Sequence, residues 1–116
     1  MKPMPRAAAT ADVFNAIAEP SRRAILDVLA GGEMAVGEIV DDLSLSQPQV
    51  SKHLRVLSEV GLVRSRADGR RRIYSVEPTR LHPMHEWLAK YEHVLNARMD
   101  RMGDYLIELQ RQGEQQ

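Results

Sequence analysis

The segment SQPQVSKHLR, residues 46–55, concentrates side chains that can hydrogen-bond to nucleic acid. A glutamine amide can pair with adenine, serine both donates and accepts, and lysine or arginine can reach guanine or a phosphate. Val50, Leu54 and Leu57 recur at positions i, i+4 and i+7, which predicts a helix over 47–58 with these residues turned inward. The remaining side chains then face outward, with one histidine near the boundary. We expect DNA contacts from Ser46, Gln47, Gln49, Ser51, Lys52, His53 and Arg55.

A second group of basic residues surrounds the turn pair Asp68-Gly69. Strand-forming residues on both sides of this pair predict a β-hairpin over 62–76. Arginine on a hairpin can follow the DNA backbone or enter a narrow minor groove. We expect Arg70 and Arg71, at the tip of this wing, to make such contacts.

Charge is distributed unevenly along the chain, although 16 basic and 16 acidic residues give a formal net charge of zero. Residues 46–80 carry eight basic and three acidic side chains, a net of +5. Residues 1–45 and 81–116 carry net charges of −3 and −2. The positive charge therefore coincides with the predicted helix and hairpin, which favours DNA binding over an ordinary solvated surface.

Further helices are predicted that would position these two elements. Thr10 can cap a first helix, Pro20 can occupy the first turn of a second, and a third is expected over 36–43. A three-residue turn then leads into the helix over 47–58, as in a helix-turn-helix. The pattern predicts a mainly α fold with a small β-hairpin wing, a winged helix-turn-helix.

A long amphipathic helix is predicted over 81–109, with apolar residues spaced three and four positions apart. It would be roughly 40 Å long, more than so small a domain can cover alone. We therefore expect a partner to cover its apolar face, and the family resemblance described below implies that this partner is a second copy of the chain, joined through the first and last helices. The predicted seam consists of Val13, Phe14, Ile17, Met84, Leu88, Tyr91, Leu95 and Met102. One domain then spans 10–110, between a flexible N-terminal arm, 1–9, and a frayed tail, 111–116.

Several other functions are disfavoured by the composition. The absence of cysteine removes disulfides, thiolate catalysis and thiolate metal sites. No Gly-x-Ser-x-Gly, P-loop or Gly-x-Gly-x-x-Gly motif is present, and Ser51 and His53 point to different sides of a helix. No apolar run suits a signal peptide or a membrane span. We expect a cytoplasmic protein that is not an enzyme, needs no cofactor and does not bind a membrane.

The chain resembles the winged helix-turn-helix repressors of the ArsR family over roughly residues 12–80. The segments that carry this resemblance are AEPSRRAILDVLAGGEMAVGEIVDDL, SQPQVSKHLRVLSEVGLV and DGRRRIYSV. The resemblance implies a cytoplasmic homodimer that represses transcription from an imperfect inverted repeat in double-stranded DNA. By position it also implies DNA contacts from Gln47, Gln49, Ser51, Lys52 and His53.

The chain also departs from the metal-binding patterns of that family. Arsenic-type members place a Cys-Val-Cys pattern at the start of the third helix, where this chain has Ala35-Val36-Gly37. Zinc-binding members use Asp-x-His and a later His-x-x-His or His-x-x-Glu. The candidate ligands here do not reproduce that spacing: His82, His85, Glu86, Glu92 and His93. The comparison implies a metal-independent member.

Two alternatives stay open at this point. In one, a metal or small ligand binds near the terminal helices and acts as an effector, with His85, Glu92 and His93 as possible zinc ligands. In the other, the winged helix is a protein-interaction module that does not bind DNA. The net charge of +5 over 46–80 argues against the second alternative.

Overall fold

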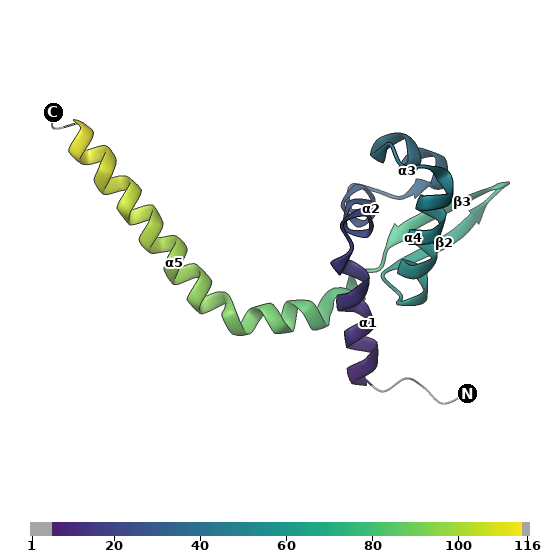
Figure 1. Cartoon of the computed structure of the whole chain (residues 1–116), viewed down its shortest axis with the longest axis horizontal. Helices are drawn as coiled ribbons and strands as arrows, with labels where there is room; N and C mark the ends of the chain where they lie inside the picture. The colour runs from purple at the N-terminus through teal and green to yellow at the C-terminus, as the bar shows by residue number, and fades with distance from the viewer. Residues whose placement is uncertain (1–5, 115–116) are drawn as a thin grey trace. The chain divides into compact units, whose positions relative to one another are not determined.

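The structure, a computed structural model, describes residues 6–114 of the 116-residue chain. It divides into two compact units, one ending at Pro83 and the other beginning at Met84. The elements are α1 (Arg6–Ala18), α2 (Pro20–Ala30), β1 (Met34–Ala35), α3 (Val36–Leu43), α4 (Gln47–Glu59), β2 (Val63–Asp68), β3 (Arg71–Val76), the 3-10 turn η1 (Pro78–Leu81) and α5 (His82–Glu114) (Figure 1). The predicted winged helix-turn-helix is confirmed.

The junction between α1 and α2 is held by side chains on both sides of Pro20. The Glu19 carboxylate caps α2 by accepting a hydrogen bond from the Arg22 N–H at 2.9 Å. The Arg22 guanidinium donates to the Ala16 carbonyl at 2.6 Å, and that of Arg23 donates to the Ile17 carbonyl at 2.8 Å. These bonds satisfy carbonyls at the end of α1 that have no partner within the helix.

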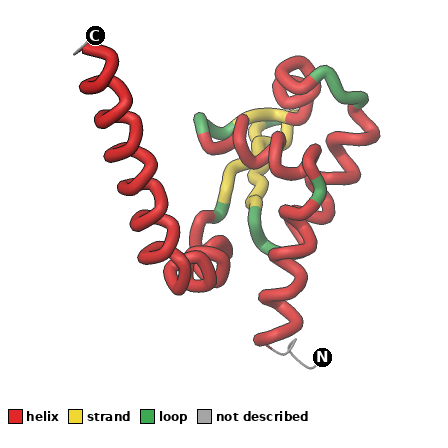
Figure 2. The backbone as a smooth tube through the Cα atoms, turned by 60° about the vertical axis from the view of Figure 1, so that its left-hand side comes forward, coloured by secondary structure: helices red, strands yellow, loops and turns green. Residues whose placement is uncertain are grey.

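The strands, drawn in yellow in Figure 2, form one antiparallel sheet in the order β1-β3-β2. β1 places Ala35 opposite Ile73, so the start of α3 is joined to the wing through the sheet. In the hairpin, Asp68 pairs with Arg71, which makes the loop Gly69-Arg70, one residue later than predicted. Gly69 has a φ of +63°, a conformation that glycine adopts without steric cost.

The core of the first unit is aliphatic and brings together helices and sheet. The inward face predicted for α4 is confirmed, because Val50, Leu54 and Leu57 are at most 1% exposed. α4 packs against α2, α3 and β2. The other buried apolar residues are Val13, Ala16, Ile25, Leu29, Ala35, Ile39, Leu62, Val63 and Ile73. This packing sets the orientation of the outer face of α4.

Both ends of the chain are more helical than expected. α1 already includes residues 6–9 of the predicted arm, while residues 1–5 lie outside the described part of the structure. α5 continues to Glu114, past the predicted end at residue 109, and 115–116 lie outside the described part. Among the described residues, no helix is long and apolar enough to cross a membrane.

Candidate nucleic-acid interface

α4 begins with a reciprocal capping box formed by Ser46 and Gln49. The Ser46 hydroxyl oxygen accepts a hydrogen bond from the Gln49 backbone N–H at 3.3 Å. In return, Gln49 Oε1 accepts from the Ser46 N–H at 3.0 Å and from its hydroxyl at 3.0 Å. Pro48, in the same turn, has no N–H that would need a partner. The first turn of α4 is thus held by its own side chains.

The outer side of α4 is polar and open to solvent. Six of the residues predicted to contact DNA are exposed there: Ser46, Gln47, Gln49, Ser51, Lys52 and Arg55. α4 is fixed by its buried face and lies beside the β2–β3 hairpin (Figure 1), so we expect its exposed polar side to continue onto the wing. The contact of these residues with DNA stays a prediction.

His53 is placed differently from the other six. Its side chain is only 16% exposed, and Nε2 lies 3.9 Å from a Glu19 carboxylate oxygen at the start of α2. Its buried Nδ1 has no hydrogen-bond partner in the described structure. The pKa of the Glu19 carboxyl is lowered, mainly by the hydrogen bond from the Arg22 N–H and further by His53. His53 therefore faces α2 rather than the open surface.

Three arginines of the wing form ion pairs with glutamates. The Arg66 guanidinium lies 2.6 Å from Glu33, which precedes β1, and that of Arg64 lies 2.9 Å from Glu77, which follows β3. The hydrogen bond between Arg66 and Glu33 lowers the pKa of the carboxyl and raises that of the guanidinium. The third pair joins Arg71 to Glu38. These pairs attach the wing to neighbouring parts of the first unit.

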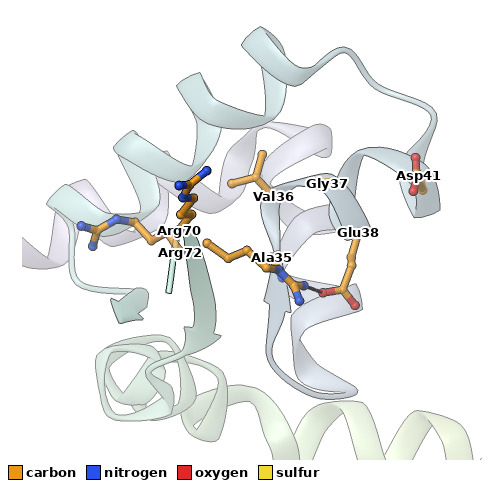
Figure 3. A pocket seen from close by; sticks show the side chains of 8 residues that line it. Ala35, Val36, Gly37, Glu38, Asp41, Arg70 and Arg72 are labelled. Atoms are coloured by element: carbon orange, nitrogen blue, oxygen red, sulfur yellow. Dashed lines mark hydrogen bonds and ion pairs between the residues drawn. The ribbon is translucent and has the colours of Figure 1, made fainter. Parts of the chain in front are cut away.

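Glu38 connects the wing to the start of α3. Its Oε1 accepts a hydrogen bond from the Ala35 N–H at 3.1 Å and lies 2.6 Å from Arg71 Nη2. Glu38 and Arg71 both line an open hollow of about 460 Å³ between α3 and the wing, and the side chains of Arg70 and Arg72 point away from Glu38 (Figure 3). Of the two predicted wing residues, Arg70 is therefore available to a ligand, whereas Arg71 is already paired.

Four cations on this surface have no carboxylate partner within the described part of the chain. They are Lys52, Arg55, Arg70 and Arg72. Arg72 donates to the neutral Ser65 hydroxyl at 2.9 Å, so its charge is uncompensated. The surface can therefore bind a polyanion through four uncompensated charges and read base edges through neutral polar groups.

The residues predicted to form a dimer seam differ in their exposure. Val13 is only 4% exposed, so it belongs to the core of its own chain and has little surface to offer a partner. Phe14 and Ile17 are partly exposed. On α5, Met84 is partly exposed, while Leu88, Tyr91, Leu95 and Met102 are between 51% and 63% exposed. The apolar stripe of α5 is thus open to solvent in the single chain.

The possible zinc ligands on α5 do not form a cluster. Across the residues that the structure describes, no three His, Asp or Glu side chains lie together in a group that could hold a metal ion. This includes His85, Glu92 and His93. The start of α3, Ala35-Val36-Gly37, offers no side-chain donor atom.

The fold and this surface define the chain as a winged helix-turn-helix protein, and comparisons with known proteins agree. The family model described as "Bacterial regulatory protein, arsR family" matches residues 19–65. The chain belongs to the ArsR family, whose members are DNA-binding transcriptional regulators and not enzymes.

Two proteins with similar sequences support this membership. The transcriptional repressor SdpR of Bacillus subtilis is 35% identical over 80 residues, which is 69% of this chain and 89% of SdpR. The regulator Rv2034 of Mycobacterium tuberculosis is 48% identical over 68 residues, 59% of this chain. The match spans 64% of Rv2034, slightly less than two thirds of its length.

Solved structures show the same fold. The crystal structure of Rv0081 from Mycobacterium tuberculosis superposes with a TM-score of 0.63 at 30% identity, over 84% of this chain and 99% of Rv0081. An ArsR-like regulator from Rhodococcus sp. RHA1 superposes with a TM-score of 0.66 at 26% identity, over 84% of this chain and 92% of the other.

Sequence reasoning missed the partners of the wing arginines. Glu33 and Glu38 each lie 33 positions from the arginine that they bind, so no local spacing could indicate the pairs. The capping box was missed as well, although its signal is present in the sequence. Ser46 and Gln49 have the Ser-x-x-Gln spacing of this motif, which suggests a structural role for both residues.

Proposed function

We propose that this protein is a homodimeric repressor that binds an inverted-repeat operator. In this proposal α4 enters the major groove and the wing contacts the flanking backbone. The observation that carries the proposal is the open polar face of α4 beside the wing, with Lys52, Arg55, Arg70 and Arg72 lacking acidic partners within the described residues. Operators lie on the chromosome, so we propose that the protein acts in the cytoplasm.

The dimer is supported by the apolar stripe of α5. Large apolar side chains such as Trp87, Leu95 and Leu106 are about half exposed in the single chain. Contiguous apolar surface on a long helix is typical of an interface with another chain. Two copies related by a twofold axis would present their α4 helices to half-sites about 34 Å apart, one turn of DNA.

We further propose that repression by this protein does not respond to metals. The arsenic site of the family requires thiolates at the start of α3, and Ala35, Val36 and Gly37 provide none. Added arsenite or zinc should therefore leave the affinity for the operator unchanged.

The salt dependence of binding tests the DNA-binding mode. With four uncompensated cations in each protomer, a dimer can contact about eight phosphates, and the slope of log K against log salt should be about −7. Operators selected from random duplexes supply the DNA, and fluorescence anisotropy measures the affinity. A slope near zero, or no selected inverted repeat, would contradict the proposal.

A matched pair of lysine variants locates the contact. Lys52→Ala removes one contact from each protomer, so the slope should become shallower by about 2 units in a dimer. Lys90→Ala removes the same charge from α5, outside the proposed interface, and should leave the slope unchanged. Equal effects of the two substitutions would show that only net charge matters and that α4 does not face the DNA.

A further inference from the structure

The first turn of α4 contains two glutamines that are chemically identical but differently engaged. Both Gln47 and Gln49 are exposed. Gln49 Oε1 accepts two hydrogen bonds of 3.0 Å from Ser46, one from its N–H and one from its hydroxyl. The Gln47 side chain has no hydrogen-bond partner among the residues that the structure describes. Only Gln47 therefore has both its carbonyl oxygen and its amide NH₂ group available.

This difference matters because glutamine reads adenine with both ends of its amide. The carbonyl oxygen accepts from adenine N6, and the NH₂ group donates to N7. Gln49 could make this pair only by releasing the Ser46 N–H, which would then lose its partner at the helix start. Pro48 supplies no N–H, so Ser46 and Gln49 carry most of the capping of this turn.

We infer that Gln49 is a positioning residue that holds the first turn of α4 in its DNA-binding conformation, and that Gln47 is the glutamine that reads a base. This inference rests on the proposed function, because it assigns roles at the same DNA-binding surface. It differs from the sequence-based expectation that both glutamines contact DNA.

The melting temperatures of three variants distinguish the positioning role of Gln49 from the base-reading role of Gln47. Gln49→Ala removes the side-chain acceptor of the Ser46 N–H but keeps the backbone N–H that bonds to the Ser46 hydroxyl, and this loss should lower Tm by about 4 °C. Gln49→Glu keeps a side-chain oxygen for the Ser46 N–H, and its charge suits the helix start, so Tm should return to about the wild-type value. Gln47→Ala removes the same side chain two positions away and should leave Tm within about 2 °C of wild type.

The ratio of affinities for selected and scrambled DNA is the measurement that a purely structural effect would leave unchanged. Wild-type protein first selects its motif from random duplexes, and Kd is then measured for the selected duplex and for a scrambled one. Gln49→Ala should weaken binding to both by the same factor, up to about fivefold, because a frayed turn lowers the population that can bind. Gln47→Ala should lower the ratio of selected to scrambled affinity by at least about fivefold. Gln49→Glu is not used here, because its charge repels any DNA.

The outcomes distinguish this inference from the function on which it rests. If Gln49→Ala keeps the wild-type Tm but lowers the ratio of affinities, or selects a different base, Gln49 reads DNA and the inference is wrong. If Gln47→Ala leaves the ratio unchanged, the assignment of base reading to Gln47 is wrong. If the wild-type protein itself selects no motif, the proposed function fails, and the inference fails with it.

Discussion

Replacing Glu38 with glutamine should make DNA binding more sensitive to salt. In the free protein the Glu38 carboxylate lies 2.6 Å from Arg71, so a phosphate that approaches this arginine must compete with it. Glu38→Gln removes the negative charge but keeps an oxygen that can accept the Ala35 N–H, so the start of α3 stays capped. The variant therefore releases Arg71 without disturbing the fold, because an exposed ion pair contributes at most about 1 kcal/mol.

The size of the effect follows from the number of phosphates contacted. One additional contact in each protomer gives two in the dimer, and each contributes about −0.9 to the slope of log K against log salt. The slope should therefore change from about −7 to about −9. Between 50 and 200 mM salt, the variant should lose roughly 12-fold more affinity than the wild type loses.

Fluorescence anisotropy with the selected operator at several salt concentrations measures both slopes. Glu108→Gln is the matched control. It also removes one acidic charge, and it frees Arg111 of α5, whose Nη1 lies 3.6 Å from Glu108 Oε2. Its slope should equal that of the wild type. If Glu38→Gln also keeps the wild-type slope, then Arg71 either leaves Glu38 whenever DNA binds or never contacts a phosphate, and Glu38 does not limit phosphate binding by Arg71.

Three further predictions concern stability and assembly. Leu54→Ala, at a buried position, should lower the free energy of unfolding by about 2–5 kcal/mol, as measured by urea denaturation. Ser58→Ala, on the exposed side of α4, should lower it by less than about 0.5 kcal/mol. Leu95→Asp combined with Met102→Asp should yield monomers in analytical ultracentrifugation, and a stable dimer would show that the seam lies elsewhere. The pKa of the Glu77 carboxyl is lowered by its hydrogen bond from Thr79 and by Arg64, so this contribution to stability is lost as pH falls below about 4.3. Glu77→Gln should flatten the decline in Tm between pH 5 and 3, and an unchanged decline would contradict this assignment.

The parts of the fold that were predictable depend on local spacing. Val50, Leu54 and Leu57 indicated both the helix and its buried face, because an inward position recurs about every 3.6 residues. The start of α1 was misplaced because Thr10 suggested a cap, although the three alanines before it favour helix strongly. Helix propensity at residues 7–9 therefore outweighed a single capping signal.

The parts of the site that were not predictable depend on contacts between distant segments. His53 lies near the boundary of the α4 face, and its orientation toward Glu19 follows from how α2 packs against α4. Likewise, Arg71 meets Glu38 because β1 pairs with β3 in a register that places Ala35 opposite Ile73. Periodicity within one segment contains no information about either contact.

These long-range pairs change how the charge of the segment 46–80 should be interpreted. Its net charge of +5 favoured DNA binding, with Arg70 and Arg71 as the expected contacts of the wing. Glu33 and Glu38 lie outside that segment in sequence but bind Arg66 and Arg71 in space, so two of these charges are compensated in the folded protein. Phosphate binding is then left to fewer cations than the sequence suggests. A slope near −7 in the wild type, rather than a steeper one, would show that the compensated arginines stay paired when DNA binds.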